Sequence, residues 1–132
     1  MPHSVAFHRT LAAAPAAAHV ARRDLRALGL SPTELATTSL LTSELLTNSV
    51  RHGGPAADGG VGLNVAVSDH SIRVEVWDGG PGFTPAARPA DAPLDSCWGL
   101  HLVESMADRW GVTPDAPNTV VWFELDRAYA PA

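Results

Sequence analysis

A carboxylate and a carboxamide stand one turn apart inside an otherwise apolar helical pattern. Glu44 and Asn48 interrupt the hydrophobic residues that recur between Leu35 and His52. Side chains four positions apart project from the same side of a helix, so Glu44 and Asn48 form a pair, with Leu41 beside them. From this helix alone two interpretations stay open: the pair lies on a solvated face, or it serves a site.

Glycines follow a strand pattern at a second place in the chain. Asp78 ends the alternating run over 72–77 and is followed by Gly79-Gly80-Pro81-Gly82. Taken alone, this stretch is typical of an ordinary tight turn. A third feature, Trp98-Gly99-Leu100, opens a helical pattern and is uninformative by itself. The three features in this order carry more information than any one of them.

Together these motifs resemble those of the histidine kinase-like (GHKL) ATPases. The run Ser43–Gly53 is similar to the asparagine box of that family, Asp78–Gly82 to its first glycine box, and Gly99–Val103 to its second. The nearest resemblance is to the small bacterial anti-sigma-factor serine/threonine kinases, whose final segments look like Ala107–Val112 and Val121–Leu125. The likeness covers nearly the whole chain.

The resemblance implies a site for ATP and Mg²⁺. Asn48 would offer its amide oxygen to the cation, which accepts few protein ligands and prefers hard oxygens. Glu44 would act as the catalytic base toward a serine hydroxyl or a water that attacks the γ-phosphate. Asp78 would accept a hydrogen bond from the exocyclic amine of adenine.

Further residues complete the implied nucleotide site. Gly80 and Gly82 would let the backbone approach the nucleotide closely. Gly99 and Leu100 open a helix whose N-terminal amides favour phosphates. The other residues implied to bind the nucleotide are Arg51, His52 and Thr119. The first two of these also suit the negative end of a helix dipole without any ligand.

The second glycine box departs from the family pattern. Relatives carry Gly-x-Gly-Leu where this chain has Cys97-Trp98-Gly99-Leu100, and a Cβ at Cys97 restricts the approach of the backbone to phosphate. Two hypotheses therefore stay open. One is a kinase that phosphorylates an anti-sigma antagonist protein and binds a sigma factor. The other is a protein-binding module of the same fold with weak or no ATP binding.

A third class of protein and the oligomeric state also bear on these hypotheses. A plain ATPase or the catalytic half of a histidine kinase is disfavoured, because no phosphoacceptor or dimerisation helix pair precedes the motifs. The resemblance is also compatible with a homodimer, which nothing in the composition indicates.

The helix that carries Glu44 and Asn48 has a well-specified start. Ser31 and Glu34 suit a capping box, and Pro32 suits the first helical position. A preceding helix is expected over 15–28, ended by a glycine. The link between the two helices is two residues long, so we expect them to pack as neighbours.

The remaining elements predict an antiparallel sheet. Alternation of apolar and polar residues indicates strands over 61–67 and 72–77, joined by a turn at Asp69-His70. A short edge strand is expected over 4–8, a helix over 99–108, and two closing strands over 110–113 and 119–125. In these closing strands, Trp110 and Trp122 are expected in the core.

The order of the elements favours an α+β (α/β) two-layer sandwich. A mainly antiparallel mixed sheet is covered on one face by about three helices, which is the Bergerat-type ATP-binding fold that the resemblance implies. At 132 residues we expect one domain over 1–132, with a core over about 4–126 and a short tail over 127–132.

Composition excludes several other classes of protein. Hydrophobic residues make up 45% and charged residues 17%, so the chain is not disordered, and no apolar run is long enough to cross a membrane. The net charge is −5, and Arg22, Arg23 and Arg26 are the one cluster of basic residues, expected on an exposed helix face; a nucleic-acid surface is not indicated. A single cysteine, Cys97, suits the cytoplasm. The six histidines show no metal-ligand spacing.

Overall fold

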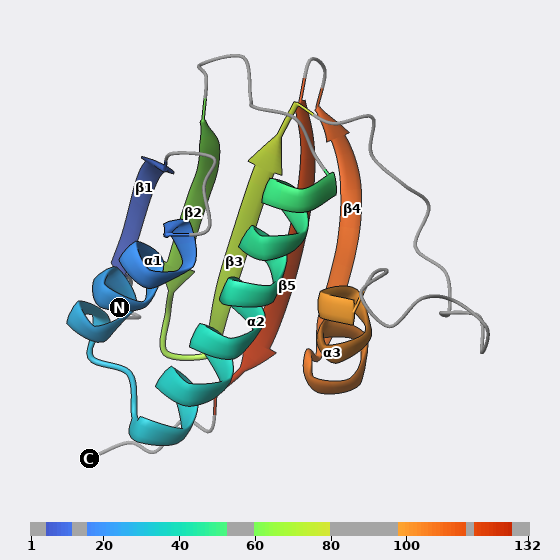
Figure 1. Cartoon of the computed structure of the whole chain (residues 1–132). Coiled ribbons are helices and arrows are strands. Elements are labelled where there is room, and N and C mark those ends of the chain that lie inside the picture. Colours follow the sequence, from blue (N-terminus) through green and yellow to red (C-terminus); the bar gives the residue numbers. More distant parts are fainter. Residues whose placement is uncertain (1–4, 12–15, 53–59, 80–97, 116–117, 128–132) are drawn as a thin grey trace.

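Five antiparallel strands form one sheet, and three α-helices cover one of its faces (Figure 1). The computed structural model describes residues 5–11, 16–52, 60–79, 98–115 and 118–127. The strands are β1 (Val5–Leu11), β2 (Val61–Val67), β3 (Ser71–Asp78), β4 (Arg109–Asp115) and β5 (Asn118–Asp126), in the spatial order β1-β2-β3-β5-β4. The helices are α1 (Ala17–Leu25), the 3₁₀ turn η1 (Arg26–Leu28), α2 (Pro32–His52) and α3 (Trp98–Met106). The predicted two-layer sandwich is confirmed, and every described strand pairing is antiparallel.

The sequence signals at the link between the first two helices, where η1 ends and α2 begins, act as predicted. The Ser31 amide donates to Glu34 Oε1 at 2.9 Å, and the Glu34 amide donates to Ser31 Oγ at 3.1 Å, which is the reciprocal capping box. Gly29 ends η1 with φ 74°, a left-handed conformation that suits glycine. The helix expected over 15–28 is thus α1 followed by η1, and α1 packs against α2.

The core lies between the helices and one face of the sheet. Alternate residues of β3 and β5 are buried, as are the apolar positions of β2, which confirms their half-buried strand patterns; in β2 Gly62 is buried as well. Helices α1 and α2 cover this face in Figure 1, and α3 packs beside α2. The largest fully buried side chains include Phe123, Leu25, Leu41, Leu45, Leu46, Leu63 and Ile72.

The face of the sheet without helices is covered by its own side chains. Trp77 lies over Gly62, where a Cβ would come within 1.7 Å of the indole. Trp122 lies opposite Gly111, and the Arg73 guanidinium stacks on its ring at 4.3 Å. Trp122 was expected in the core and is on the other face, because Val121 and Phe123 occupy the core positions of β5. Trp110 packs against the core as expected.

An ion pair joins the end of β5 to the start of α2. Arg127 donates to both carboxylate oxygens of Glu34, at 2.8 Å and 3.1 Å, and to the backbone oxygen of Ser68 at 2.7 Å. The tail was expected to begin at Arg127. This residue instead links three elements of the fold, since Ser68 lies in the turn between β2 and β3.

This ion pair predicts a pH-dependent contribution to stability. The hydrogen bonds from Arg127 lower the pKa of Glu34, so the stabilisation is present above the ordinary glutamate pKa and is lost as pH falls through the lower folded pKa. Glu34→Gln keeps the capping group and removes the charge. We expect it to lower the free energy of unfolding by about 1 kcal/mol at pH 7 and by progressively less as the pH is lowered into the acid range, measured by urea unfolding.

The matched control for this prediction is Glu104→Gln. Glu104 is exposed on α3 and has no hydrogen-bond or ion-pair partner among the described residues. The control variant should unfold like the wild type throughout this pH range. A loss in Glu34→Gln that persisted unchanged at pH 3 would assign the effect to something other than the ion pair.

Candidate functional site

The Glu44–Asn48 pair lies on the flank of α2 that faces away from α1. The α1-facing flank is marked by Ser43, whose Oγ accepts a hydrogen bond from Arg22 Nε at 3.0 Å. Each residue turns a helix by about 100°, so Glu44 and Asn48 lie about 100° and 140° around from Ser43. Helix α3 packs against α2 on this other side (Figure 1). Both side chains are half-buried there, which is unlike a fully solvated helix face.

A buried carboxylate and a buried hydroxyl face each other across two neighbouring strands. Asp78 is the last residue of β3 and is 7% exposed, and Thr119, also 7% exposed, is its partner in register on β5. Both continue the row of core-facing positions at the point where the apolar residues stop. Both also have interaction partners in the structure. A carboxylate has about four lone-pair positions and can therefore accept more than one hydrogen bond.

The two groups of polar residues lie toward the same end of the sheet. Helix α2 packs along β3, and the C-terminal ends of both elements point the same way in Figure 1. Asn48 is near the end of α2 and Asp78 is at the end of β3. The fold therefore brings the second half of the asparagine box and the start of the first glycine box to one region.

Of the other predicted site residues, four are placed only by their position in a helix, and two lie outside the described residues. Arg51 and His52 end α2, and Gly99 and Leu100 lie in the first turn of α3. The predicted nucleotide contacts Gly80 and Gly82 lie outside the described residues, as does Cys97.

The described residues near this end of the sheet include oxygen donors of the kind that Mg²⁺ accepts. No group of three or more His, Cys, Asp or Glu residues gathers in the described part of the chain. Mg²⁺ is usually bound through one or two protein oxygens together with waters and substrate phosphates. Asn48 offers an amide oxygen of this kind, and Asp78 offers a buried carboxylate.

Two buried hydroxyls on α2 were not identified from the sequence. Thr38 and Thr42 are one turn apart, are fully buried between α2 and the core, and their Oγ1 atoms have no hydrogen-bond partner among the described residues. The signal was available, since two threonines four apart in an apolar stripe stand out as Glu44 and Asn48 do. They lie on the buried side of α2 and not on the flank that carries the pair.

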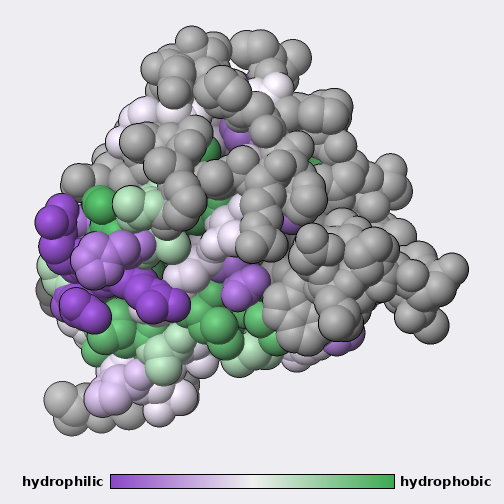
Figure 2. Space-filling view, viewed as in Figure 1, coloured by the Kyte–Doolittle hydropathy of each residue, from purple (hydrophilic) through white to green (hydrophobic). Residues whose placement is uncertain are grey.

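Hydrophilic and hydrophobic side chains are unevenly distributed over the helical face. Figure 2 shows strongly hydrophilic side chains gathered over α1, with hydrophobic ones beside them.

Among the described helices, none is both long and apolar enough to cross a membrane.

The comparisons with known proteins agree with this arrangement. A model of the histidine kinase-like ATPase domain matches residues 7–125. No curated protein matches the chain. A solved structure of the RsbU and RsbW domains of Rv1364c from Mycobacterium tuberculosis is similar, with a TM-score of 0.67 and 24% sequence identity.

That structural likeness extends over 92% of this chain and 31% of the Mycobacterium chain, so this chain spans about a third of that protein's length. At this identity the likeness shows a shared fold. The family model covers far more than half of the sequence and includes every motif discussed above. The chain belongs to the histidine kinase-like ATPase family.

Proposed function

We propose that this protein binds ATP with Mg²⁺ and transfers the γ-phosphate to a serine or threonine of an anti-sigma antagonist protein, while also binding a sigma factor. One observation carries the nucleotide part of the proposal. Buried Asp78 lies in register with Thr119 at the end of the sheet toward which the Asn48 end of α2 points.

Each described residue has a defined task in this proposal. Asp78 accepts from the exocyclic amine of adenine and so selects the base. Asn48 offers its amide oxygen to the cation that neutralises the phosphates. Glu44, one turn earlier on the same flank, accepts the proton of the attacking hydroxyl. The first turn of α3 would direct its backbone amides to phosphate oxygens, which helix N-termini suit.

Support for the protein partners comes from two sources. The final segments of the sequence resemble those of anti-sigma-factor kinases, and the fold is shared with a structure that contains an RsbW domain. The second candidate function is a protein-binding module of the same fold with weak or no ATP binding. Cys97 favours this candidate, because it replaces a glycine of the second glycine box.

Calorimetric titration of the full chain with ATP and MgCl₂ tests the nucleotide site. We expect micromolar to low millimolar binding, weakened at least about tenfold by Asn48→Ala, since the cation loses its only proposed protein ligand. Omitting Mg²⁺ should remove the difference between wild type and variant.

Thr47→Ala is the matched control for this titration. Thr47 is the exposed neighbour of Asn48 on α2 and points away from the proposed site, so its loss should leave affinity unchanged. If the wild type failed to bind ATP at millimolar concentration, the kinase would be ruled out in favour of the binding module.

A further inference from the structure

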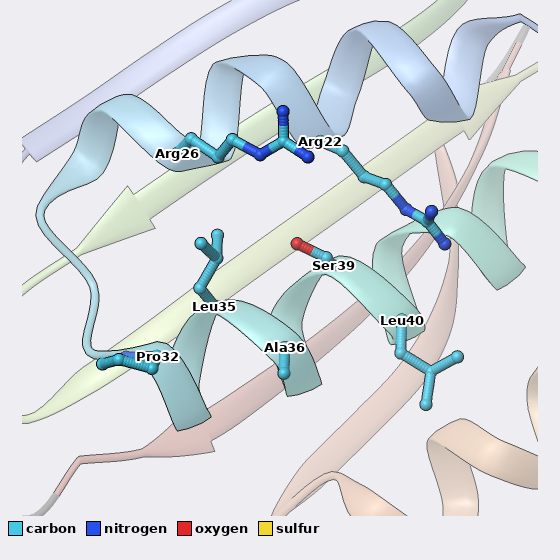
Figure 3. A pocket seen from close by; sticks show the side chains of 7 residues that line it. All are labelled: Arg22, Arg26, Pro32, Leu35, Ala36, Ser39 and Leu40. Atoms are coloured by element: carbon cyan, nitrogen blue, oxygen red, sulfur yellow. The ribbon is translucent and has the colours of Figure 1, made fainter.

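A groove lies between α1 and α2, on the flank of α2 opposite the Glu44–Asn48 pair. It has a volume of about 410 Å³, within the usual range for ligand pockets, and is open to solvent. Its lining residues are Arg22, Arg26, Pro32, Leu35, Ala36, Ser39 and Leu40. Figure 3 shows Arg22 extending from α1 and Arg26 from η1, with Leu35 and Ser39 pointing toward them from α2. The groove thus has a basic side and a mainly apolar side.

The two arginines of this groove are held differently. Arg22 donates from Nε to Ser43 Oγ at 3.0 Å, which orients its guanidinium over α2 and leaves the two terminal nitrogens for another acceptor. Arg26 has no hydrogen-bond or ion-pair partner among the described residues. The two are four positions apart at the junction of α1 and η1, so their side chains lie on the same side of this helical segment, about 6 Å apart at Cβ.

The arginines of the sheet contrast with those of α1. Arg73, Arg109 and Arg127 each form an ion pair with a carboxylate of this chain. The ion pairs of the described residues involve Arg73, Arg109 and Arg127, and none of them involves Arg22, Arg23 or Arg26. In a chain of net charge −5, α1 and η1 thus carry Arg22, Arg23 and Arg26 against one carboxylate, Asp24, and form a local basic patch, which Figure 2 shows as a hydrophilic area.

We propose that this groove binds an acidic amphipathic helix of a partner protein. Two carboxylates one turn apart on such a helix match the spacing of Arg22 and Arg26. Leucine-sized side chains on the same face of the partner cover Leu35, Ala36 and Leu40. Because Glu44, Asn48 and Asp78 do not line the groove, this inference stands independently of the proposed nucleotide site.

The apolar side of the groove selects this occupant over a simple anion. Inorganic phosphate would pair with the guanidinium groups and leave the leucines exposed to water. A helix with both carboxylates and leucines satisfies the two sides together, and burial of apolar area adds to the charge attraction.

A synthetic helical peptide of about 16 residues, with glutamates at positions i and i+4 and leucines at i+3 and i+7, is the probe. Added to the full-length ¹⁵N-labelled chain without nucleotide, it should shift the amide signals of Leu35, Ala36 and Ser39. Fluorescence anisotropy with the labelled peptide should show affinity at least about tenfold lower for Arg22→Glu/Arg26→Glu. A peptide with lysines in place of the glutamates should bind this double variant better than the wild type.

Arg23→Glu is the matched control, because Arg23 is exposed on the same helix and does not line the groove. It should change peptide affinity by less than about twofold. Equal losses in Arg23→Glu and Arg26→Glu would overturn the groove in favour of unspecific charge attraction.

Three other outcomes overturn the proposal. Absence of binding at millimolar peptide rejects the groove as a docking site. Equal affinity for inorganic phosphate and for the peptide assigns an anion site with no role for the leucines. Concentration-dependent shifts of the same amides without peptide assign the groove to a second copy of this chain. Failure of ATP binding leaves each of these readings unaffected, since no nucleotide is present.

Discussion

Replacing Glu44 by glutamine is expected to slow γ-phosphate release from ATP by about 10²–10⁴-fold while leaving ATP affinity within about twofold of the wild type. The half-buried carboxylate lies on the same flank as Asn48, one turn away, so it can accept a proton without contacting the base or the cation. Glutamine keeps the size and removes the basic group. Single-turnover release of labelled phosphate, alongside calorimetry, measures both quantities with water as the acceptor.

Glu104→Gln provides the comparison for this loss of rate. It makes the same chemical change at an exposed position of α3, and both rate and affinity should stay at wild-type values. A parallel loss of binding and turnover in Glu44→Gln would contradict the division of roles between Glu44 and Asn48, because a base acts on the chemical step alone.

The helices of this fold were predictable because their signals are local. The capping box at Ser31 and Glu34, the proline between them and the glycine after η1 all act within a few residues, and each appears in the structure as expected. Helical spacing likewise predicts an apolar stripe on α2 that includes Leu40, Leu41, Leu45 and Leu46; the last three are buried in the core, whereas Leu40 is only half-buried. Local hydrogen bonds and helical periodicity need no knowledge of the rest of the chain.

The arrangement of the strands was less predictable. Periodicity indicated each strand, but β3 pairs with β5 and not with the next strand along the chain. Only this pairing brings Asp78 opposite Thr119, two residues that lie in separate motifs. Register depends on long-range packing, so the site's geometry could be expected only through the resemblance and not from alternation.

Two side-chain contacts had no sequence signal at all. Arg127 pairs with Glu34 across 93 positions, and Arg22 reaches Ser43 across 21. Neither residue belongs to a repeating pattern that would identify its partner. Such contacts follow from how α1 and β5 pack against α2, which is known only when the elements are placed together.

Asp78→Asn is expected to shift the nucleotide preference of the site from ATP toward GTP and not simply to weaken the binding of both nucleotides. Adenine presents an exocyclic amine donor where guanine presents a carbonyl acceptor. The Asp78 carboxylate accepts a hydrogen bond from the amine of adenine and repels the carbonyl oxygen of guanine. An asparagine amide can instead donate to that carbonyl oxygen. We expect ATP affinity to fall about tenfold and GTP affinity to rise, measured by competition against a fluorescent ATP analogue.

Asp126→Asn separates this effect from a general loss of charge. Asp126 is exposed at the opposite end of β5 from Thr119, so the same substitution there should leave the ATP to GTP ratio unchanged. If Asp78→Asn weakened both nucleotides equally, the buried carboxylate would be acting on the fold of the strand ends and not on the base. A rise in GTP affinity cannot come from a damaged fold, and it therefore identifies Asp78 as the group that reads the nucleobase.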